Sequence, residues 1–249
     1  MGYISYKDSI KSKRLHFLHR VNRAESVLKE AKYYISLKNK NVLDVGCGNG
    51  ALSYILAKSG AKVFSIDTDN KILKEAKIFC KPYKISFKKS EAEKLPFRDK
   101  FFDVVFCFDV LEHVKNPDKV IKECKRVLKR DGYIYLEISP YYSIIAGSHL
   151  YYYTFLPMQF FPKSFVKWYI SKKKSVPLET KKTSLKRFFG LNRLTIKNLY
   201  NIIKRNKLLI VKEKFIIKYP DLFDINLKYL KYAGFLGELL TISYIVTLK

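Results

Sequence analysis

Apolar and amphipathic segments alternate along residues 41–138. Five short segments rich in β-branched and aromatic side chains predict strands, at residues 41–45, 62–66, 85–88, 103–108 and 133–138. Between them, apolar side chains at helical spacing predict helices, at residues 51–58, 70–79 and 117–128. Asp131 and Gly132 predict a turn that leads into the last strand. This alternation is typical of a parallel sheet with helical crossovers.

The pattern changes on both sides of this stretch. Upstream, residues 9–35 predict a basic helix. Downstream, residues 140–189 lack the alternation, contain four prolines and many aromatic residues, and predict a helical cap. A helix capped by Thr195 follows, with strands at residues 208–217 and 239–248. We therefore predict an α/β fold: a seven-stranded, mostly parallel, doubly wound sheet with an N-terminal helix and a helical cap inserted after the fifth strand.

A glycine-rich loop lies directly after the first predicted strand. The predicted ligand-binding residues of this loop are Asp44, Gly46, Cys47, Gly48, Asn49 and Gly50. Glycines let the backbone turn sharply and approach a ligand closely. The glycine spacing alone also fits a dinucleotide loop. The charge of Asp44 separates the two, because it suits a ligand with an ammonium and a sulfonium group and opposes a pyrophosphate. The loop therefore favours S-adenosylmethionine over NAD.

A second carboxylate ends the next predicted strand. Asp67 occupies the position from which a carboxylate accepts hydrogen bonds from both ribose hydroxyls, and Thr68 follows it. The alternative is that Asp67 caps the following helix, a role for which Asp69 is also available. We predict ribose binding by Asp67 and include Thr68 in the cofactor site.

Three further segments complete a family pattern. They are Ser-Glu-Ala-Glu-Lys-Leu-Pro-Phe at 90–97, Phe-Asp-Val-Val-Phe at 102–106 and Asp-Val-Leu-Glu-His-Val at 109–114. With the glycine loop and Asp67, they resemble the class I, Rossmann-like methyltransferases typified by ubiquinone and menaquinone biosynthesis enzymes (methyltransferase type 11). The resemblance covers residues 41–139. It implies that Glu91, aspartate in most of the family, faces the adenine amino group, that Ala92 contacts the ring through its backbone, and that Asp109 and Val110 line the cofactor.

This resemblance completes the predicted organisation and chemistry. Residues 1–40 form a basic helical segment, 41–139 the S-adenosylmethionine-binding core, 140–189 an acceptor-side cap and 190–249 the remainder of the core. Methyl transfer is an in-line displacement on an activated sulfonium, so positioning supplies most of the catalysis. His113 and His149 are the candidate general bases for an oxygen acceptor, and the alternative for each is a packing role.

Other sites are disfavoured. No Asn/Asp-Pro-Pro-aromatic motif of amino-methylating enzymes follows the fourth strand, and no cysteine stands beside proline as in pyrimidine C5 enzymes. His16 and His19 lie one helical turn apart without a third ligand, so no metal site is predicted. The four cysteines form no CxxC pair and no signal peptide precedes them, which predicts reduced thiols in a cytoplasmic protein.

The net charge of +27 is unevenly distributed, at +7 for residues 1–40, +5 for 41–150 and +15 for 151–249. Such an excess attracts phosphate in lipid headgroups or nucleic acid, and the alternative is compositional bias. No apolar run is long enough to span a bilayer. In the cap, aromatic residues precede three consecutive lysines, a mixture suited to a headgroup interface.

We therefore predict O- or C-methylation of a small-molecule or lipid-like acceptor, with peripheral contact to an anionic membrane surface. The alternative is an RNA methyltransferase that binds nucleic acid through the basic aromatic cap. A non-catalytic binding protein is a third class, disfavoured because no cofactor-site position looks destroyed. The sequence leaves the oligomeric state open.

Overall fold

The computed structural model of the 249-residue chain describes residues 12–144, 147, 150, 154, 156–173, 178–216, 241 and 243–249. The helices are α2 (Lys13–Tyr34), α3 (Ala51–Lys58), α4 (Asn70–Phe79), α5 (Pro117–Val127), the 3₁₀ helix η1 (Met158–Phe160), α6 (Lys163–Ser171), α7 (Leu178–Phe189) and α8 (Ile196–Arg205). The strands are β1 (Asn41–Val45), β2 (Lys62–Asp67), β3 (Ser86–Lys89), β4 (Phe102–Phe108), β5 (Leu128–Ile138), β6 (Ile210–Ile216) and β7 (Ser243–Leu248).

The strands form a seven-stranded sheet in the order β3-β2-β1-β4-β5-β7-β6. Strand β1 pairs in parallel with β2 and with β4, and β2 pairs in parallel with β3. Strands β6 and β7 are antiparallel. The predicted mostly parallel, doubly wound α/β sheet is confirmed, and most predicted elements agree with the observed ones to within two residues.

The chain divides into two compact units. The first comprises Met1–Phe108 and Lys119–Tyr135 with Lys249, and the second comprises Asp109–Asp118 and Leu136–Leu248. The glycine loop, Asp67 and the segment after β3 all belong to the first unit. The predicted cofactor residues from Asp44 to Ala92 therefore belong to the first unit, and Asp109 and Val110 belong to the second.

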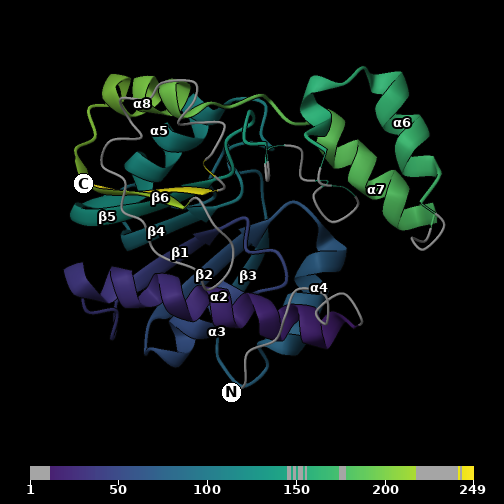
Figure 1. The fold of residues 1–249 in the computed structure, drawn as a ribbon. Coiled ribbons are helices and arrows are strands. Elements are labelled where there is room, and N and C mark those ends of the chain that lie inside the picture. Colours follow the sequence, from purple (N-terminus) through teal and green to yellow (C-terminus); the bar gives the residue numbers. More distant parts are fainter. Residues whose placement is uncertain are drawn as a thin grey trace. The chain divides into compact units, whose positions relative to one another are not determined.

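The core of the first unit is built on β1 and its neighbours. Val42, Leu43 and Val45 are fully buried, as expected for a central parallel strand that is covered on both faces. Helices α2 and α3 lie on one side of these strands, and α5 lies on the other (Figure 1). On the first side, Phe17 and Val21 of α2 join the cluster of buried side chains that includes β1 and α3. The predicted N-terminal helix thus packs on the core.

One local prediction is wrong. Asp131 and Gly132 do not form a turn before the strand predicted at residues 133–138, because β5 begins at Leu128 and runs through both residues. A β-carbon added at Gly132 would lie 2.8 Å from the carbonyl oxygen of Asp103 on β4. Glycine is therefore needed here for the close approach of two backbones.

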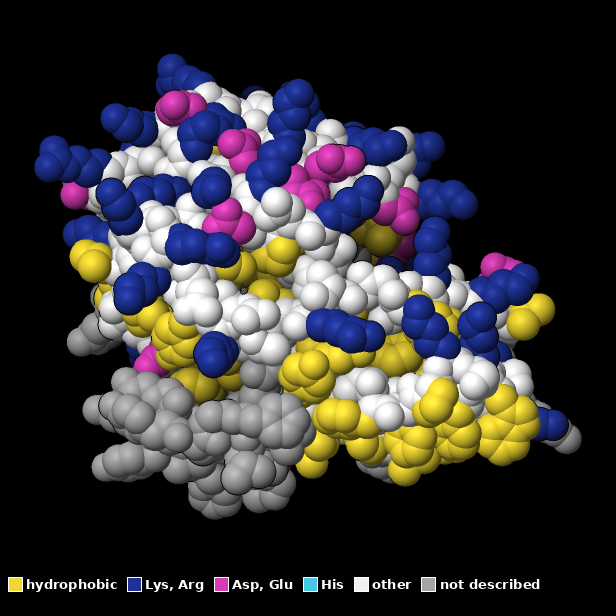
Figure 2. Space-filling view, turned by 90° about the horizontal axis from the view of Figure 1, so that it is seen from above, with side chains coloured by type: hydrophobic (Ala, Val, Ile, Leu, Met, Phe, Trp, Pro, Cys, Tyr) yellow, Lys and Arg dark blue, Asp and Glu magenta, His cyan; other side chains and the backbone are white. Residues whose placement is uncertain are grey.

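The second unit contains the predicted helical cap. Helices α6 and α7 share a small core of Leu150, Met158, Val166, Ile170 and Phe188. Figure 2 shows hydrophobic side chains gathered over the α6 side of the molecule, with Lys and Arg side chains at several points around them. Within the described part of the chain, no helix has the length and apolar character that a membrane span requires.

Asp103 supplies a test of the first unit's stability. Its carboxylate accepts hydrogen bonds from the Asn41 amide and the Lys129 ammonium, each at 2.9 Å. Burial raises the pKa of Asp103, but these hydrogen bonds outweigh it and hold the pKa below the ordinary 3.8. We expect Asp103→Asn to lower the free energy of unfolding by about 1–3 kcal/mol at pH 7.

The pH dependence of this difference identifies its cause. Since the folded-state pKa is depressed, the stabilisation is present above the unfolded-state pKa and disappears as the pH falls through the folded-state pKa. Urea unfolding of both proteins between pH 7 and pH 3 should therefore give converging stabilities. A difference that stays constant with pH would contradict the assignment to the carboxylate charge.

Candidate functional site

The glycine loop turns at the carboxyl end of β1. Val45 pairs with Ile66 of β2 and with Cys107 of β4, so the carboxyl ends of three parallel strands lie side by side. The Cys47 amide donates to the Ile66 carbonyl at 2.9 Å and fixes the loop against β2. In open α/β sheets, ligands bind outside the carboxyl ends of the strands, and the glycine loop lies at this edge.

Gly48 and Gly50 of the loop have different structural roles. Gly48 and Gly50 both adopt positive φ, at +53° and +82°. A β-carbon at Gly50 would lie 2.8 Å from Cys80 Sγ and 3.1 Å from the Ala76 β-carbon, whereas one at Gly48 would meet nothing within 4 Å. Gly50 thus allows the loop to pack on α4, and Gly48 borders open space that a ligand can occupy.

Beneath the loop lies a buried carboxyl group. Asp44 is 3% exposed, and its Oδ2 accepts a 2.6 Å hydrogen bond from Ser53 Oγ on α3. Ser53 Oγ in turn accepts from Ser65 Oγ on β2 at 2.9 Å. Burial raises the pKa of Asp44 to about 6, although the Ser53 hydrogen bond and the Arg20 charge oppose the rise. The site therefore holds a carboxylate that a cationic ligand would stabilise.

Helix α2 contributes side chains that the sequence did not identify. The positive charge of Arg20 acts on Asp44, and His16 Nδ1 lies 3.4 Å from Asn49 Nδ2 in the glycine loop. Asn49 is buried, and its Oδ1 accepts no hydrogen bond within the described residues. A buried carbonyl oxygen without a donor fits a bound ligand that supplies one.

Asp67 stands beside this loop. Its Oδ2 accepts from the Gly48 amide and its Oδ1 from the Asp69 amide, each at 3.0 Å. Asp69, and not Asp67, caps α4, since its side chain accepts from the amides of Lys71 and Ile72. Each oxygen of Asp67 has a second lone pair, so the carboxylate is held at the loop with acceptor capacity left for hydroxyl groups.

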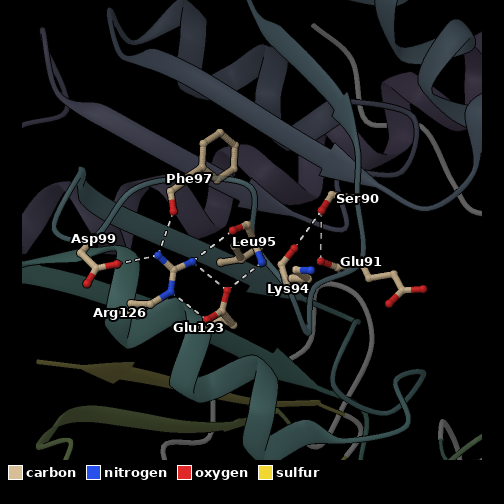
Figure 3. Close-up of polar contacts among 8 residues, drawn as sticks. All are labelled: Ser90, Glu91, Lys94, Leu95, Phe97, Asp99, Glu123 and Arg126. Carbon is tan, nitrogen blue, oxygen red and sulfur yellow. Dashed lines mark hydrogen bonds and ion pairs between the residues drawn. The ribbon is translucent and has the colours of Figure 1, made fainter.

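The segment after β3 is held by α5. Arg126 donates to the carbonyl oxygens of Leu95 and Phe97 and to both oxygens of Glu123, and Glu123 accepts from the Leu95 amide at 2.7 Å (Figure 3). Arg126 also pairs with Asp99 at 2.7 Å. A guanidinium group has the planar, multiple donors that such a set of acceptors needs. The backbone of residues 95–99 is therefore shaped by one side chain.

The residues predicted to meet adenine lie at the start of this segment. Ala92 is buried, whereas Glu91 is exposed and its carboxylate points away from the Arg126 cluster in Figure 3. Phe97 packs edge-on against Phe102, with ring centroids 4.9 Å apart. Thr68 is exposed after β2. Phe97 therefore has a packing role, and the adenine contacts of Glu91 and Ala92 stay predictions.

The residues after β4 belong to the second unit. Asp109 has a positive φ of 54° and donates its amide to the Glu137 carbonyl at 3.0 Å. Val110 is half-buried, and His113 is exposed with its amide bonded to the Val110 carbonyl. The cofactor roles of Asp109 and Val110 and the base role of His113 stay predictions. His149 lies outside the described residues.

Glu112, which the sequence reasoning did not assign, is the most buried carboxyl group of this turn. It is 2% exposed and accepts from the Ser139 amide at 3.3 Å. Burial, followed by the negative charge of Asp109, raises its pKa. A charged residue at a buried position of the Asp-Val-Leu-Glu-His run is the signal that would have drawn attention to it.

The four cysteines are free thiols, and all four are buried. Burial and then the Asp44 charge raise the pKa of Cys47, and they raise that of Cys80 to about 12. Neither thiol is therefore activated as a nucleophile. Across the described residues, no three His, Cys, Asp or Glu side chains form a metal-binding group.

Comparisons with known proteins agree on the kind of domain. Residues 43–136 match the family model described as a methyltransferase domain. This match spans the glycine loop, Asp67, the Arg126-held segment and most of β5. Over residues 43–136 the chain is therefore similar to methyltransferase domains.

Curated relatives match half of the chain or less. A ubiquinone biosynthesis O-methyltransferase of Coxiella burnetii is 36% identical over 127 residues, which is 50% of this chain and 52% of the relative. One of Dechloromonas aromatica is 43% identical over 105 residues, or 41% of this chain and 45% of the relative. The chain thus matches about half the length of these methyltransferases.

Solved methyltransferase structures share the fold. The magnesium protoporphyrin IX methyltransferase of Synechocystis PCC 6803 with bound S-adenosylhomocysteine has a TM-score of 0.58 and 16% identity, over 100% of this chain and 89% of the other. The PH0226 protein of Pyrococcus horikoshii has a TM-score of 0.58 and 18% identity, over 93% of this chain and 91% of the other. These similarities confirm the methyltransferase fold.

Alanine at each of the two loop glycines should separate folding from binding. Both substitutions place a side chain at positive φ, at a cost of about 1–2 kcal/mol. Gly50→Ala adds the contact with Cys80 and should reduce the free energy of unfolding further, by about 1–3 kcal/mol. Gly48→Ala should stay folded and bind S-adenosylmethionine roughly tenfold more weakly, because its methyl group occupies the ligand side. Urea unfolding and titration calorimetry measure the two effects, and normal binding by Gly48→Ala would contradict this placement.

Arg126→Lys should loosen the segment after β3. A lysine cannot replace the paired hydrogen bonds to Glu123 and the Leu95 and Phe97 carbonyls. We expect amide exchange across residues 95–99 to accelerate by roughly fivefold or more, equivalent to about 1 kcal/mol or more of local stability. Arg98→Lys is the control, since Arg98 lies over the Phe101 ring, 5.1 Å from its centroid, and lysine can keep that contact. Equal protection in the two variants would show that Arg126 does not shape this backbone.

Proposed function

We propose that the protein is an S-adenosylmethionine-dependent methyltransferase that acts on oxygen or carbon of a small-molecule or lipid-like acceptor. The observation that supports this most is the buried Asp44 carboxyl group under a glycine loop, with Arg20 near it. A carboxylate at this point repels a pyrophosphate and attracts a cation. The charge pattern therefore favours a sulfonium cofactor over a dinucleotide.

The residues of the first unit fit the parts of that cofactor. Asp44 would receive the ammonium group, and Arg20 the carboxylate, of the methionine moiety. Asp67 would accept from the ribose hydroxyls, next to Thr68. Asn49 Oδ1 is a further acceptor with no donor among the described residues. Glu91 and Ala92 would meet adenine on a backbone that Arg126 holds.

The chemistry requires little beyond alignment. When bound, S-adenosylmethionine supplies a methyl group on a positively charged sulfur, and the acceptor atom bonds to the methyl carbon as the carbon–sulfur bond breaks. Orienting the two reactants accounts for about 7–11 kcal/mol of such a barrier. An oxygen acceptor also loses a proton, for which His113 and His149 are the proposed bases. Replacement of each by glutamine, with kcat measured against pH, tests this role.

The acceptor class rests on the relatives and on the cap. The relatives are named as ubiquinone biosynthesis O-methyltransferases, which supports O-methylation of a lipid-like aromatic acceptor. Since the chain matches only about half of their length, this remains a proposal about this chain. The aromatic residues around η1 and α6 support an amphiphilic acceptor. The rival function, RNA methylation, is favoured by the lysines that lie among these aromatic residues.

One assay distinguishes these functions. The protein is incubated with methyl-labelled S-adenosylmethionine and cell extract separated into lipid, RNA, protein and small-molecule fractions. We expect label in the lipid or small-molecule fraction, and none with Asp44→Asn. Label in RNA would overturn the acceptor assignment, whereas calorimetry that detects no S-adenosylmethionine binding would overturn the methyltransferase proposal itself.

The raised pKa of Asp44 predicts how cofactor binding changes with pH. The ionised carboxylate attracts the cofactor's ammonium group, and the ligand-free pKa is about 6. Protonation therefore competes with binding below pH 6, and the dissociation constant should rise about tenfold between pH 7 and pH 5. Calorimetry at both pH values measures it. Asp44→Asn should bind weakly at both, without this dependence.

Asp67→Ala is the matched control for this pH effect. It should weaken binding by about 1–3 kcal/mol through lost hydrogen bonds. The tenfold change between pH 7 and pH 5 should persist in Asp67→Ala, because Asp44 is intact. A wild-type affinity that does not change with pH would show that Asp44 does not meet the cationic part of the ligand.

A further inference from the structure

The second unit has an exposed row of aromatic side chains on α6. Phe161, two residues before the helix begins, and Trp168 within it are 37% and 56% exposed, and Phe165 between them is half-buried against the small core. Phe165 and Trp168 are three residues apart and lie on one side of the helix, and Phe161 joins them by stacking on Phe165. Val166 and Ile170, which are fully buried, form the other side and pack in the small core shared with α7.

The rings of this row are packed on one another. Phe161 stacks on Phe165 with centroids 4.9 Å apart, and the Phe165 and Trp168 centroids are 5.7 Å apart. Phe160 and Leu156, just before them, are also exposed, at 48% and 40%. Folding of α6 and α7 therefore leaves a continuous apolar surface in water rather than isolated rings.

The charge around this row is almost entirely positive. Residues 156–190 contain nine Lys or Arg and one acidic residue, Glu179. Lys172, the C-cap residue directly after α6, follows Trp168 by four residues and so lies on the same side as the aromatic row. Lys173 lies 4.6 Å from the centroid of the Tyr169 ring. Long lysine side chains can keep their charge at a headgroup while their aliphatic parts extend along apolar surface.

We propose that this α6 face, defined by Phe160, Phe161, Phe165, Trp168 and Lys172, binds the surface of a bilayer that contains anionic phospholipid. The aromatic rings enter the boundary between headgroups and acyl chains, and the lysines meet the phosphates. The chemistry is that of a peripheral, interfacial helix. This proposal concerns where the protein binds, so it stands or fails separately from methyl transfer.

The packing of the rings favours lipid over nucleic acid. Sequence-tolerant binding of single-stranded RNA uses aromatic faces on which bases stack. In the α6 face, Phe161 and Phe165 already stack on each other and present a joint apolar surface. Such a surface is suited to acyl chains, which need area and not individual ring faces.

The chain contains one tryptophan, and it lies in this face. Tryptophan emission therefore reports on the proposed contact without any label. The wild-type protein is titrated with vesicles of phosphatidylcholine alone or of phosphatidylcholine with about one-third phosphatidylglycerol, without S-adenosylmethionine. We expect a blue shift and quenching by brominated acyl chains with the anionic vesicles only, since the lysines need the anionic charge.

Variants then distinguish the α6 face from general basicity. Phe161→Glu and Trp168→Glu should each weaken vesicle co-sedimentation by roughly tenfold or more, because each places a charge where the rings enter the lipid. Ile78→Glu on α4 is the matched control, since Ile78 is 72% exposed and the change in charge is the same. Lys172→Glu should weaken binding by about fivefold or more, and Lys77→Glu on α4 should have little effect.

Each alternative result overturns the proposal. Co-sedimentation without a change in Trp168 emission would show that another basic surface makes the contact. Equal losses in Phe161→Glu and Ile78→Glu would show a charge effect without insertion. An emission change with single-stranded RNA, and none with vesicles, would assign the face to nucleic acid.

Discussion

The carboxyl group of Asp44 is the constraint on which the first unit's site depends. A carboxylate that is 3% exposed is unfavourable in a protein interior unless it is hydrogen-bonded and balanced by charge. Ser53 on α3 donates the hydrogen bond to Asp44, Ser65 on β2 donates in turn to Ser53, and Arg20 supplies the charge from α2. The balance is incomplete, because the pKa still rises to about 6. A cationic ligand would complete it, which makes the affinity for such a ligand a consequence of how the core is built.

The two sides of the site are stabilised by different means. Around the glycine loop, the backbone conformation determines the shape of the site. Gly50 permits contact with α4, Gly48 leaves open space, and the Asp67 carboxylate accepts a hydrogen bond from the Gly48 amide. After β3 a single side chain holds the backbone in place, because Arg126 binds two carbonyl groups and two carboxylates. Chain segments far apart in sequence therefore fix a short, largely exposed segment that has no regular structure of its own.

The sequence could predict what depends on neighbouring residues, and it could not predict what depends on distant ones. Strand β1, its glycine loop and the Asp69 cap follow from residues within a few positions of one another. Arg20 and Arg126 carry no such signal. Asp44 lies 24 residues from Arg20, and the Phe97 and Leu95 carbonyls lie 29 and 31 residues from Arg126, so only packing brings these groups together. The Asp131-Gly132 pair gave the wrong signal. Such a pair usually indicates a turn, but here glycine is required because a β-carbon would clash with the backbone of the neighbouring strand at Asp103. The polar Ser53, in an otherwise apolar helix next to the glycine loop, was a signal available but unused.

The excess of lysine has different structural consequences in the two units. In the first unit, lysines pair with carboxylates, as Lys13 does with Glu75 and Lys129 with Asp103. Along residues 156–190 there is one acidic residue for nine basic ones, so most of these charges have no acidic partner within the segment. Compositional bias explains an abundance of lysine, but it does not explain why carboxylates are scarce beside an exposed aromatic row. The arrangement of charge and apolar surface, rather than the total charge, therefore favours a specific anionic partner for α6.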